Sequence, residues 1–225
     1  MAARAPHFYV RPLQAMPSPR FKATRSDGSD ATSELLAFAE AIGLESVISG
    51  RYSFLLLLEL FGATQSGMLN PAKVVSQIRV LEGVEAARGL KTATQFKHPP
   101  LRGLWHQHYL EDGLPSMARN IRKGIGKFGL PWVEQKIADA KISGEERYFT
   151  EADAAQIAHD AVVSNWERLI DNEALTGEWL IFAKHEEKNY YLSLGKHNSG
   201  DELLRTQIDA ICLQEFTFLK DILIG

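Results

Sequence analysis

The sequence predicts an α+β fold: a mainly helical single domain with a small antiparallel β-hairpin or sheet near the C-terminus. Most of the chain repeats apolar side chains at helical spacing. Residues 177–196 instead hold two segments rich in aromatic and branched side chains around the polar turn HEEKN. The 225 residues suffice for one sizeable core, and 45% apolar with 24% charged residues is typical of a soluble globular protein.

The N-terminal segment differs from the rest in charge. Residues 1–26 contain five Lys or Arg side chains, no Asp or Glu, and no apolar period. A segment of this kind has little apolar surface to bury. We therefore expect an extended or disordered basic arm at 1–26, followed by one globular α+β domain at 27–225.

The first helices follow from spacing and capping signals. Apolar residues recur every three or four positions over 32–42, which predicts a helix. Residues 52–61 are apolar almost all round, which predicts a buried helix at the centre of the core. Asn70 is a good N-cap and Pro71 suits the first helical position, so a third helix is expected from there to about residue 87.

The middle of the chain is less regular. Pro99 and Pro100 exclude a helix locally. Residues 104–109, LWHQHY, alternate well enough to predict a short strand, with a loop as the alternative. Pro115 is expected to open a helix that reaches Lys123 and ends at the glycines that follow it.

Three further elements complete the expected order. Pro131 opens a helix to about residue 142, and Thr150 with Asp153 forms a capping box for a helix to about residue 170. After the hairpin, a helix over 200–214 places Cys212 on a buried face. This single cysteine excludes an intrachain disulfide and favours a reducing, cytoplasmic location. No apolar run approaches the roughly 20 residues of a membrane span.

The candidate site begins with a basic segment. Residues 88–128 hold eight Lys or Arg side chains against two acidic ones. On a helical wheel Met117 and Ile121 share the face that we expect to pack on the core, and the cations gather on the opposite face. Such a face suits phosphate, which guanidinium and ammonium groups bind. The predicted phosphate contacts are Arg119, Arg122, Lys123 and Lys127.

The histidines of the chain are candidates for acid–base catalysis. In LWHQHY, strand geometry places His106 and His108 on one face, where a neutral and a protonated imidazole can exchange protons with a substrate. His185 and His197, flanked by Lys184 and Lys196, are added as catalytic candidates because the two Lys-His pairs are expected at corresponding ends of the hairpin strands. Structural packing is the alternative for each of these histidines.

These features predict an RNA-directed hydrolase: a metal-independent, ribonuclease-like nuclease that acts on RNA or another phosphodiester without a cofactor. One alternative is a metal-dependent hydrolase ligated by His98, His106 and His108. The other is a non-catalytic interaction protein whose basic face docks an acidic protein partner. The sequence leaves the oligomeric state open.

Overall fold

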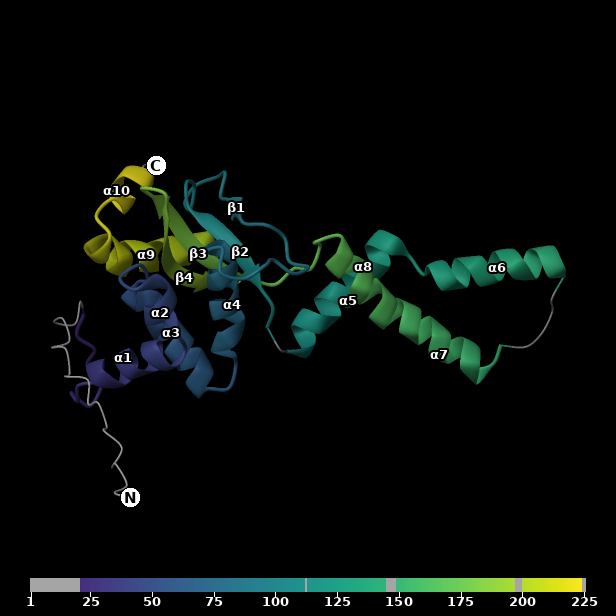
Figure 1. Cartoon of the computed structure of the whole chain (residues 1–225), viewed down its shortest axis with the longest axis horizontal. Coiled ribbons are helices and arrows are strands. Elements are labelled where there is room, and N and C mark those ends of the chain that lie inside the picture. The colour runs from purple at the N-terminus through teal and green to yellow at the C-terminus, as the bar shows by residue number, and fades with distance from the viewer. Residues whose placement is uncertain (1–20, 112, 145–148, 197–199, 224–225) are drawn as a thin grey trace, which may run out of the picture.

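The computed structural model describes residues 21–111, 113–144, 149–196 and 200–223. It confirms the α+β class: the chain is mainly helical around a four-stranded antiparallel sheet (Figure 1). In chain order the elements are α1 (Thr32–Ala41), α2 (Leu44–Ile48), α3 (Phe54–Gln65), α4 (Pro71–Leu81), β1 (Thr94–Gln95), β2 (Trp105–Tyr109), α5 (Leu114–Phe128), α6 (Pro131–Ser143), α7 (Glu151–His159), the π-helix η1 (Asp160–Ser164), α8 (Asn165–Asp171), β3 (Glu178–His185), β4 (Lys188–Gly195), α9 (Asp201–Glu215) and α10 (Leu219–Ile222).

The sheet has the order β1-β2-β3-β4, and the predicted hairpin and the predicted strand in LWHQHY are both present. His106 pairs with Ile181 and His108 with Trp179. Because successive side chains leave a strand on opposite faces, these four side chains share one face of the sheet. The hairpin turns through Glu186, at φ 48°, and its neighbour at φ 59°.

Two cores lie on the two faces of the sheet. Helices α1–α4 cover the face that carries Leu180, Phe182 and Tyr191. Helices α9 and α10 cover the other face at Ile181 and Leu192. The sheet is therefore the layer between the two sets of helices (Figure 1).

Helix α3 occupies the central position that the sequence predicts. Leu55, Leu56, Leu57 and Leu60 are buried, and Leu58 is 38% exposed. Their apolar faces contact α1, β4 and α9. The Asn70 side chain caps α4 as expected, accepting a hydrogen bond from the Ala72 backbone N–H at 3.0 Å.

A helical extension, residues 114–171, leaves the core between β2 and β3 (Figure 1). The predicted capping box at its centre is confirmed: Thr150 and Asp153 bond to each other's backbone N–H groups. The single helix expected there is interrupted by η1, where buried Asp160 accepts hydrogen bonds from the Trp132 N–H and from Arg168.

The expected end of α5 at Lys123 is wrong. The helix runs through Gly124 and Gly126 and ends at Gly129, which has φ 66°. Gly124 serves packing, because a Cβ there would lie 2.9 Å from the Cβ of Asn165. Glycine lowers helix propensity by about 1 kcal/mol, a cost that tertiary packing readily offsets.

The end of the predicted basic arm packs on the core. The ring of Phe21 lies 4.5 Å from that of Phe54, and Ala23 is buried, with its N–H donated to Thr32 Oγ1. Most of the arm, residues 1–20, lies outside the described residues. The placement of the domain boundary at residue 26 stays a prediction.

Candidate functional site

Helix α5 is rotated from the orientation that the sequence predicts. Its buried side is formed by Ser116, Asn120 and Gly124, whereas Met117 is 44% exposed and Ile121 is only half-buried. The expectation that the two apolar residues pack on the core is therefore wrong. Small and hydrogen-bonding residues form the contact instead.

The reason for this orientation is a reciprocal pair of hydrogen bonds. The Asn120 side chain donates to the Thr176 carbonyl at 2.8 Å and accepts from the Thr176 N–H at 2.9 Å. The buried polar groups are thereby satisfied, which removes the desolvation cost that would otherwise exclude an asparagine from this position. Nothing in the apolar period of α5 signals this bond.

Two of the four predicted phosphate contacts also hold the helical extension to the core. Arg119 Nη1 lies 3.0 Å from the carboxylate of Glu178, whose side chain is 5% exposed. The Lys123 ammonium donates to the Ala174 carbonyl. Each retains further N–H donors, since a guanidinium has five and an ammonium three.

A further cation, which the sequence analysis did not single out, joins the site. The pKa of Lys123 is lowered, first by partial burial and then by the like charges of Lys91 and Lys127. The loop that carries Lys91 meets α5 here, because Leu90 bridges Leu175 and Lys123 donates to the carbonyl of the adjacent Ala174. Among the described residues no carboxylate forms an ion pair with Lys91, Arg122 or Lys127.

The loop that carries Lys91 also forms a small cavity. Its volume is about 140 Å³, and Arg88, Lys91, Gln77 and Gln107 contribute to its polar lining. Gln107 holds the loop, because its amide donates to the Lys91 carbonyl and to Gln77 Oε1, each at 3.1 Å. The cavity thus combines the cationic side chains of Arg88 and Lys91 with two amide side chains. The sequence indicated this site only through the positive charge of residues 88–128. The contact between the Lys91 loop and α5 is a tertiary contact, which the sequence pattern does not contain.

His106 and His108 are adjacent, as the strand geometry predicts. Their ring centroids lie 5.5 Å apart, and Phe96 and Trp179 lie within 4.7 and 5.2 Å of the His106 ring. His108 is 6% exposed. Its Nδ1 lies 2.8 Å from the Gly177 carbonyl and 3.4 Å from the Gly177 backbone nitrogen, so Nδ1 has a partner there in either tautomer.

The histidine pair and the basic helix meet at the same end of β3. His108 contacts Gly177, and Arg119 contacts the next residue, Glu178. The imidazoles, however, leave β2 on the face opposite Gln107, the side chain that holds the Lys91 loop. The two groups of residues are therefore neighbours across one end of the sheet.

The remaining predicted catalytic histidines do not join this pair. The two Lys-His segments lie at opposite ends of the hairpin: Lys184 pairs with Asn189 at the turn, and Lys196 follows Gly195, which pairs with Trp179. The prediction that the two pairs lie at corresponding ends is wrong, because β3 and β4 run antiparallel and the end of β3 lies beside the start of β4. The His185 ring stacks on Phe218 at 4.1 Å. His197 lies outside the described residues.

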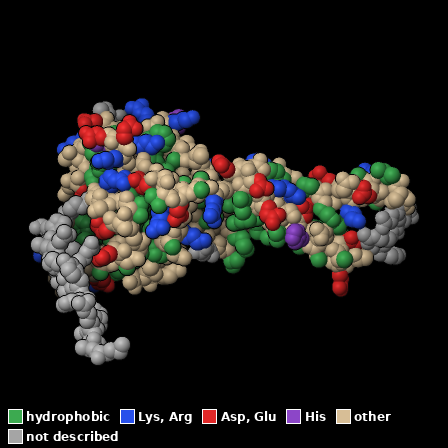
Figure 2. All heavy atoms as spheres, viewed as in Figure 1, with side chains coloured by type: hydrophobic (Ala, Val, Ile, Leu, Met, Phe, Trp, Pro, Cys, Tyr) green, Lys and Arg blue, Asp and Glu red, His purple; other side chains and the backbone are tan. Residues whose placement is uncertain are grey.

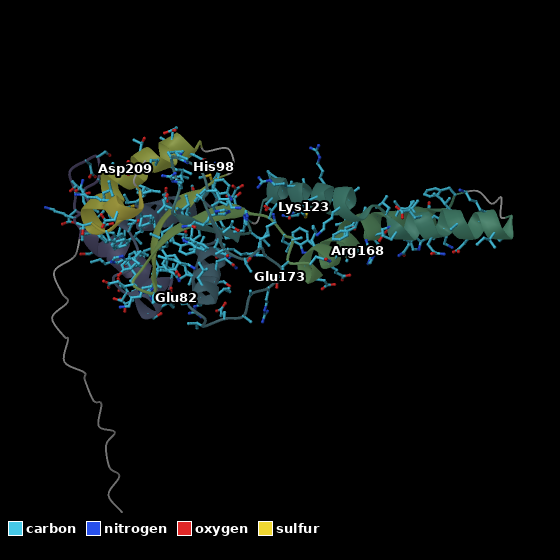
Figure 3. The ribbon with its side chains drawn as sticks, turned by 90° about the horizontal axis from the view of Figure 1, so that it is seen from above. Glu82, His98, Lys123, Arg168, Glu173 and Asp209 are labelled. Carbon is cyan, nitrogen blue, oxygen red and sulfur yellow. The ribbon has the colours of Figure 1, made fainter. Side chains whose placement is uncertain are left out.

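The metal alternative receives no geometric support from the described residues. No three His, Cys, Asp or Glu side chains among them come close enough to hold an ion. His98 is exposed on the loop after β1, on the core, whereas Lys123 marks the base of the helical extension (Figure 3). The set of His98, His106 and His108 is not brought together.

Two titratable groups lie at or in the core: Glu59 is half-buried and Cys212 is fully buried. The Glu59 carboxylate accepts hydrogen bonds from Ser193 Oγ and the Leu194 N–H, and burial raises its pKa to about 7. Burial also raises the pKa of the Cys212 thiol to about 12, as expected for an unreactive core residue. The sequence analysis did not single out Glu59, because the apolar run around it does not show which residues of the helix face β4.

Comparison of the chain with protein-family models, with curated proteins and with solved structures found no match. Within the described parts of the chain, no helix has the length and apolar character needed to cross a bilayer. The argument about function therefore depends on the geometry of the site.

Proposed function

We propose that the protein binds single-stranded RNA through a basic surface formed by Lys91, Arg122, Lys123 and Lys127. The observation that carries the proposal is the meeting of the Lys91 loop with α5, because Leu90 bridges Leu175 and Lys123 donates to the carbonyl of the adjacent Ala174. Like charges repel, so placing three ammonium groups near one another costs free energy when no carboxylate among the described residues pairs with them. An anionic ligand would recover this free energy.

A single strand suits the geometry better than a duplex. The cations and the imidazoles lie on different faces at one end of the sheet, so a ligand that reaches both must bend sharply. A single strand bends at small cost, whereas a duplex is stiff over about 150 base pairs. The partly exposed rings of Phe96, His106 and Trp179 offer surfaces on which bases stack.

Cleavage of the bound strand is the second part of the proposal. His108 would accept the proton of a ribose 2′-hydroxyl as the hydroxyl oxygen attacks the phosphorus. A protonated His106 would donate a proton to the departing 5′-oxygen, which leaves a 2′,3′-cyclic phosphate.

Fluorescence anisotropy with a labelled single-stranded RNA tests the proposal. The charge-reversed variant Lys91→Glu/Lys127→Glu should bind about tenfold more weakly or worse. The matched control Lys188→Glu/Lys220→Glu, on exposed residues outside this surface, should bind as the wild type does. RNA that fails to bind the wild type even at low salt overturns the proposal and leaves an acidic protein as the remaining partner.

A further inference from the structure

Exposed apolar side chains are concentrated on the helical extension. Of the thirteen large apolar residues that are exposed in the described structure, nine lie between residues 114 and 171. Figure 2 shows hydrophobic side chains gathered over α5, beside the core. Large contiguous apolar surface on a folded chain marks an interaction site more often than a solvated surface.

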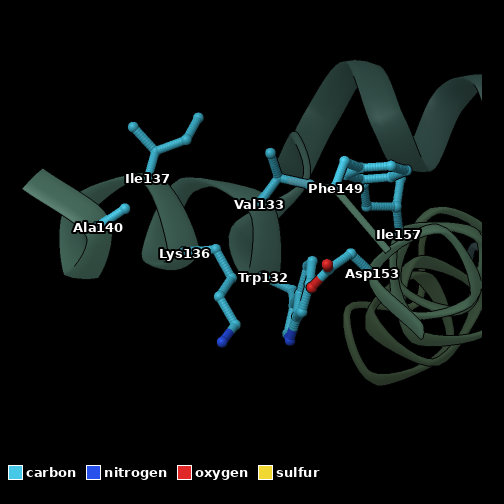
Figure 4. A pocket seen from close by; sticks show the side chains of 8 residues that line it. All are labelled: Trp132, Val133, Lys136, Ile137, Ala140, Phe149, Asp153 and Ile157. Atoms are coloured by element: carbon cyan, nitrogen blue, oxygen red, sulfur yellow. The ribbon is translucent and has the colours of Figure 1, made fainter. Parts of the chain in front are cut away.

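Helices α6 and α7 lack a core of their own. No residue of either helix, all of which the structure describes, is buried. Between them runs an apolar groove of about 340 Å³, lined by Trp132, Val133, Ile137, Phe149 and Ile157 (Figure 4). Helices of 13 and 9 residues are marginal in water unless their apolar faces are covered. We therefore expect another apolar surface to cover the groove.

Helix α5 of the same extension has an exposed apolar stripe that could fill such a groove. Leu114, Met117 and Ile125 make an apolar stripe along α5, exposed by 76, 44 and 38%. At 1.5 Å per residue, the stripe from Leu114 to Ile125 spans about 17 Å, and the part of α6 that lines the groove, from Trp132 to Ala140, spans about 12 Å. The stripe is therefore long enough to fill the groove. Amphipathic helices dock into apolar grooves through such side chains.

The charges of the two surfaces are complementary. Residues 114–128 carry four Lys or Arg side chains and no acidic one. Helices α6 and α7 carry four acidic side chains, Glu134, Asp139, Glu151 and Asp153, against the two basic ones Lys136 and Lys141. A positive helix and a negative helical pair on one chain attract each other between two copies, and the same contact then forms twice about a two-fold axis.

We propose that two copies of this chain pair through their helical extensions, with α5 of each copy seated in the α6–α7 groove of the other. The apolar stripe provides the buried contact, and Arg122 at its edge faces the acidic side chains of the partner. Arg122 also belongs to the proposed RNA-binding surface, so the pairing is tested at Met117 and Ile137, which do not.

Sedimentation equilibrium of the full chain tests the pairing. The wild type should be a dimer that dissociates on dilution and, more readily, at high salt. Met117→Asp on the stripe and Ile137→Asp in the groove should each give monomers. Val84→Asp, at an exposed position outside the extension, is the matched control and should remain dimeric. Circular dichroism of each variant reports whether it folds.

A mixing experiment distinguishes reciprocal docking from other contacts. The Met117→Asp chain keeps an intact groove and the Ile137→Asp chain keeps an intact stripe, so an equal mixture can form one complete contact that neither variant forms alone. Dimer should therefore reappear in the mixture, at lower affinity than in the wild type. A wild type that is monomeric throughout overturns the proposal. So does a dimer that both folded variants leave unchanged, or a mixture that stays monomeric.

Discussion

The guanidinium of Arg119 and the carboxylate of Glu178 form an ion pair, at 3.0 Å, that joins the basic helix to the first residue of β3. The carboxylate is almost fully buried and the guanidinium is about two-fifths exposed. Arg119 is therefore a structural contact of α5 as well as a candidate phosphate ligand.

Arg119→Ala should lower the free energy of unfolding by about 1–3 kcal/mol, because a buried carboxylate loses a charged partner. Arg122→Ala is the control on the same helix. It should change stability by no more than about 0.5 kcal/mol, since its side chain is exposed. Urea denaturation of both variants measures the difference. Equal stabilities would show that the ion pair contributes nothing.

The half-buried carboxyl of Glu59 should make stability depend on pH. Burial raises its pKa to about 7 in the folded chain, against 4.5 for the free side chain. The folded state therefore holds the proton over a range where the unfolded state has released it, so this group's contribution falls as the pH rises from about 4.5 to 7. The loss amounts to about 3 kcal/mol.

Glu59→Gln should remove this dependence, because the amide keeps an acceptor for the Leu194 N–H and does not titrate. The difference in unfolding free energy between variant and wild type should grow from pH 5 to pH 8 in favour of the variant. A difference that stays constant with pH would mean that Glu59 does not titrate in this range.

The hairpin turn offers a stabilising change. Glu186 and Glu187 both have positive φ, which side chains other than Gly, Asn and Asp adopt at a cost. Replacing the pair by Asn-Gly should add about 1 kcal/mol, which raises the melting temperature of a chain of this size by about 2–4 °C. Differential scanning calorimetry measures the change. A lower melting temperature would show that the two glutamates stabilise the turn by other contacts.

Local signals predicted most of the fold. The alternation of residues 177–196, the apolar run of α3, the Asn70 cap and the Thr150 capping box each depend on neighbours within a few positions. Such signals are visible in a single sequence. They gave the α+β class, the hairpin and the central helix.

The errors involve distant contacts. The rotation of α5 depends on Asn120 bonding to Thr176, 56 positions away, and its continuation past Gly124 depends on close packing against Asn165. A helical wheel weighs only apolar side chains and contains neither contact. The basic segment is visible in the sequence as a region of positive charge. The role of Lys91 is not, because it depends on a contact between distant parts of the chain.

The histidine pair is tested by turnover. If His108 and His106 act as base and acid, His108→Ala and His106→Ala should each reduce cleavage of labelled RNA by about 100-fold or more, with EDTA present. Binding by His108→Ala should stay near the wild-type level, because its buried imidazole is neither a proposed phosphate contact nor a stacking surface. His106→Ala also removes a stacking ring, so its turnover is compared at saturating RNA. Wild-type turnover in both folded variants would assign the imidazoles a packing role with Phe96 and Trp179. Loss of turnover with EDTA in the wild type would favour a metal.

The dependence of RNA affinity on salt tests the central claim most directly. Four cations that neutralise phosphates of a single strand should give a slope of log affinity against log salt of about −2.8. Lys91→Ala/Lys127→Ala should reduce the slope to about −1.4, and the control Lys188→Ala/Lys220→Ala should keep it near −2.8. A slope that is the same in wild type and in Lys91→Ala/Lys127→Ala would contradict the account.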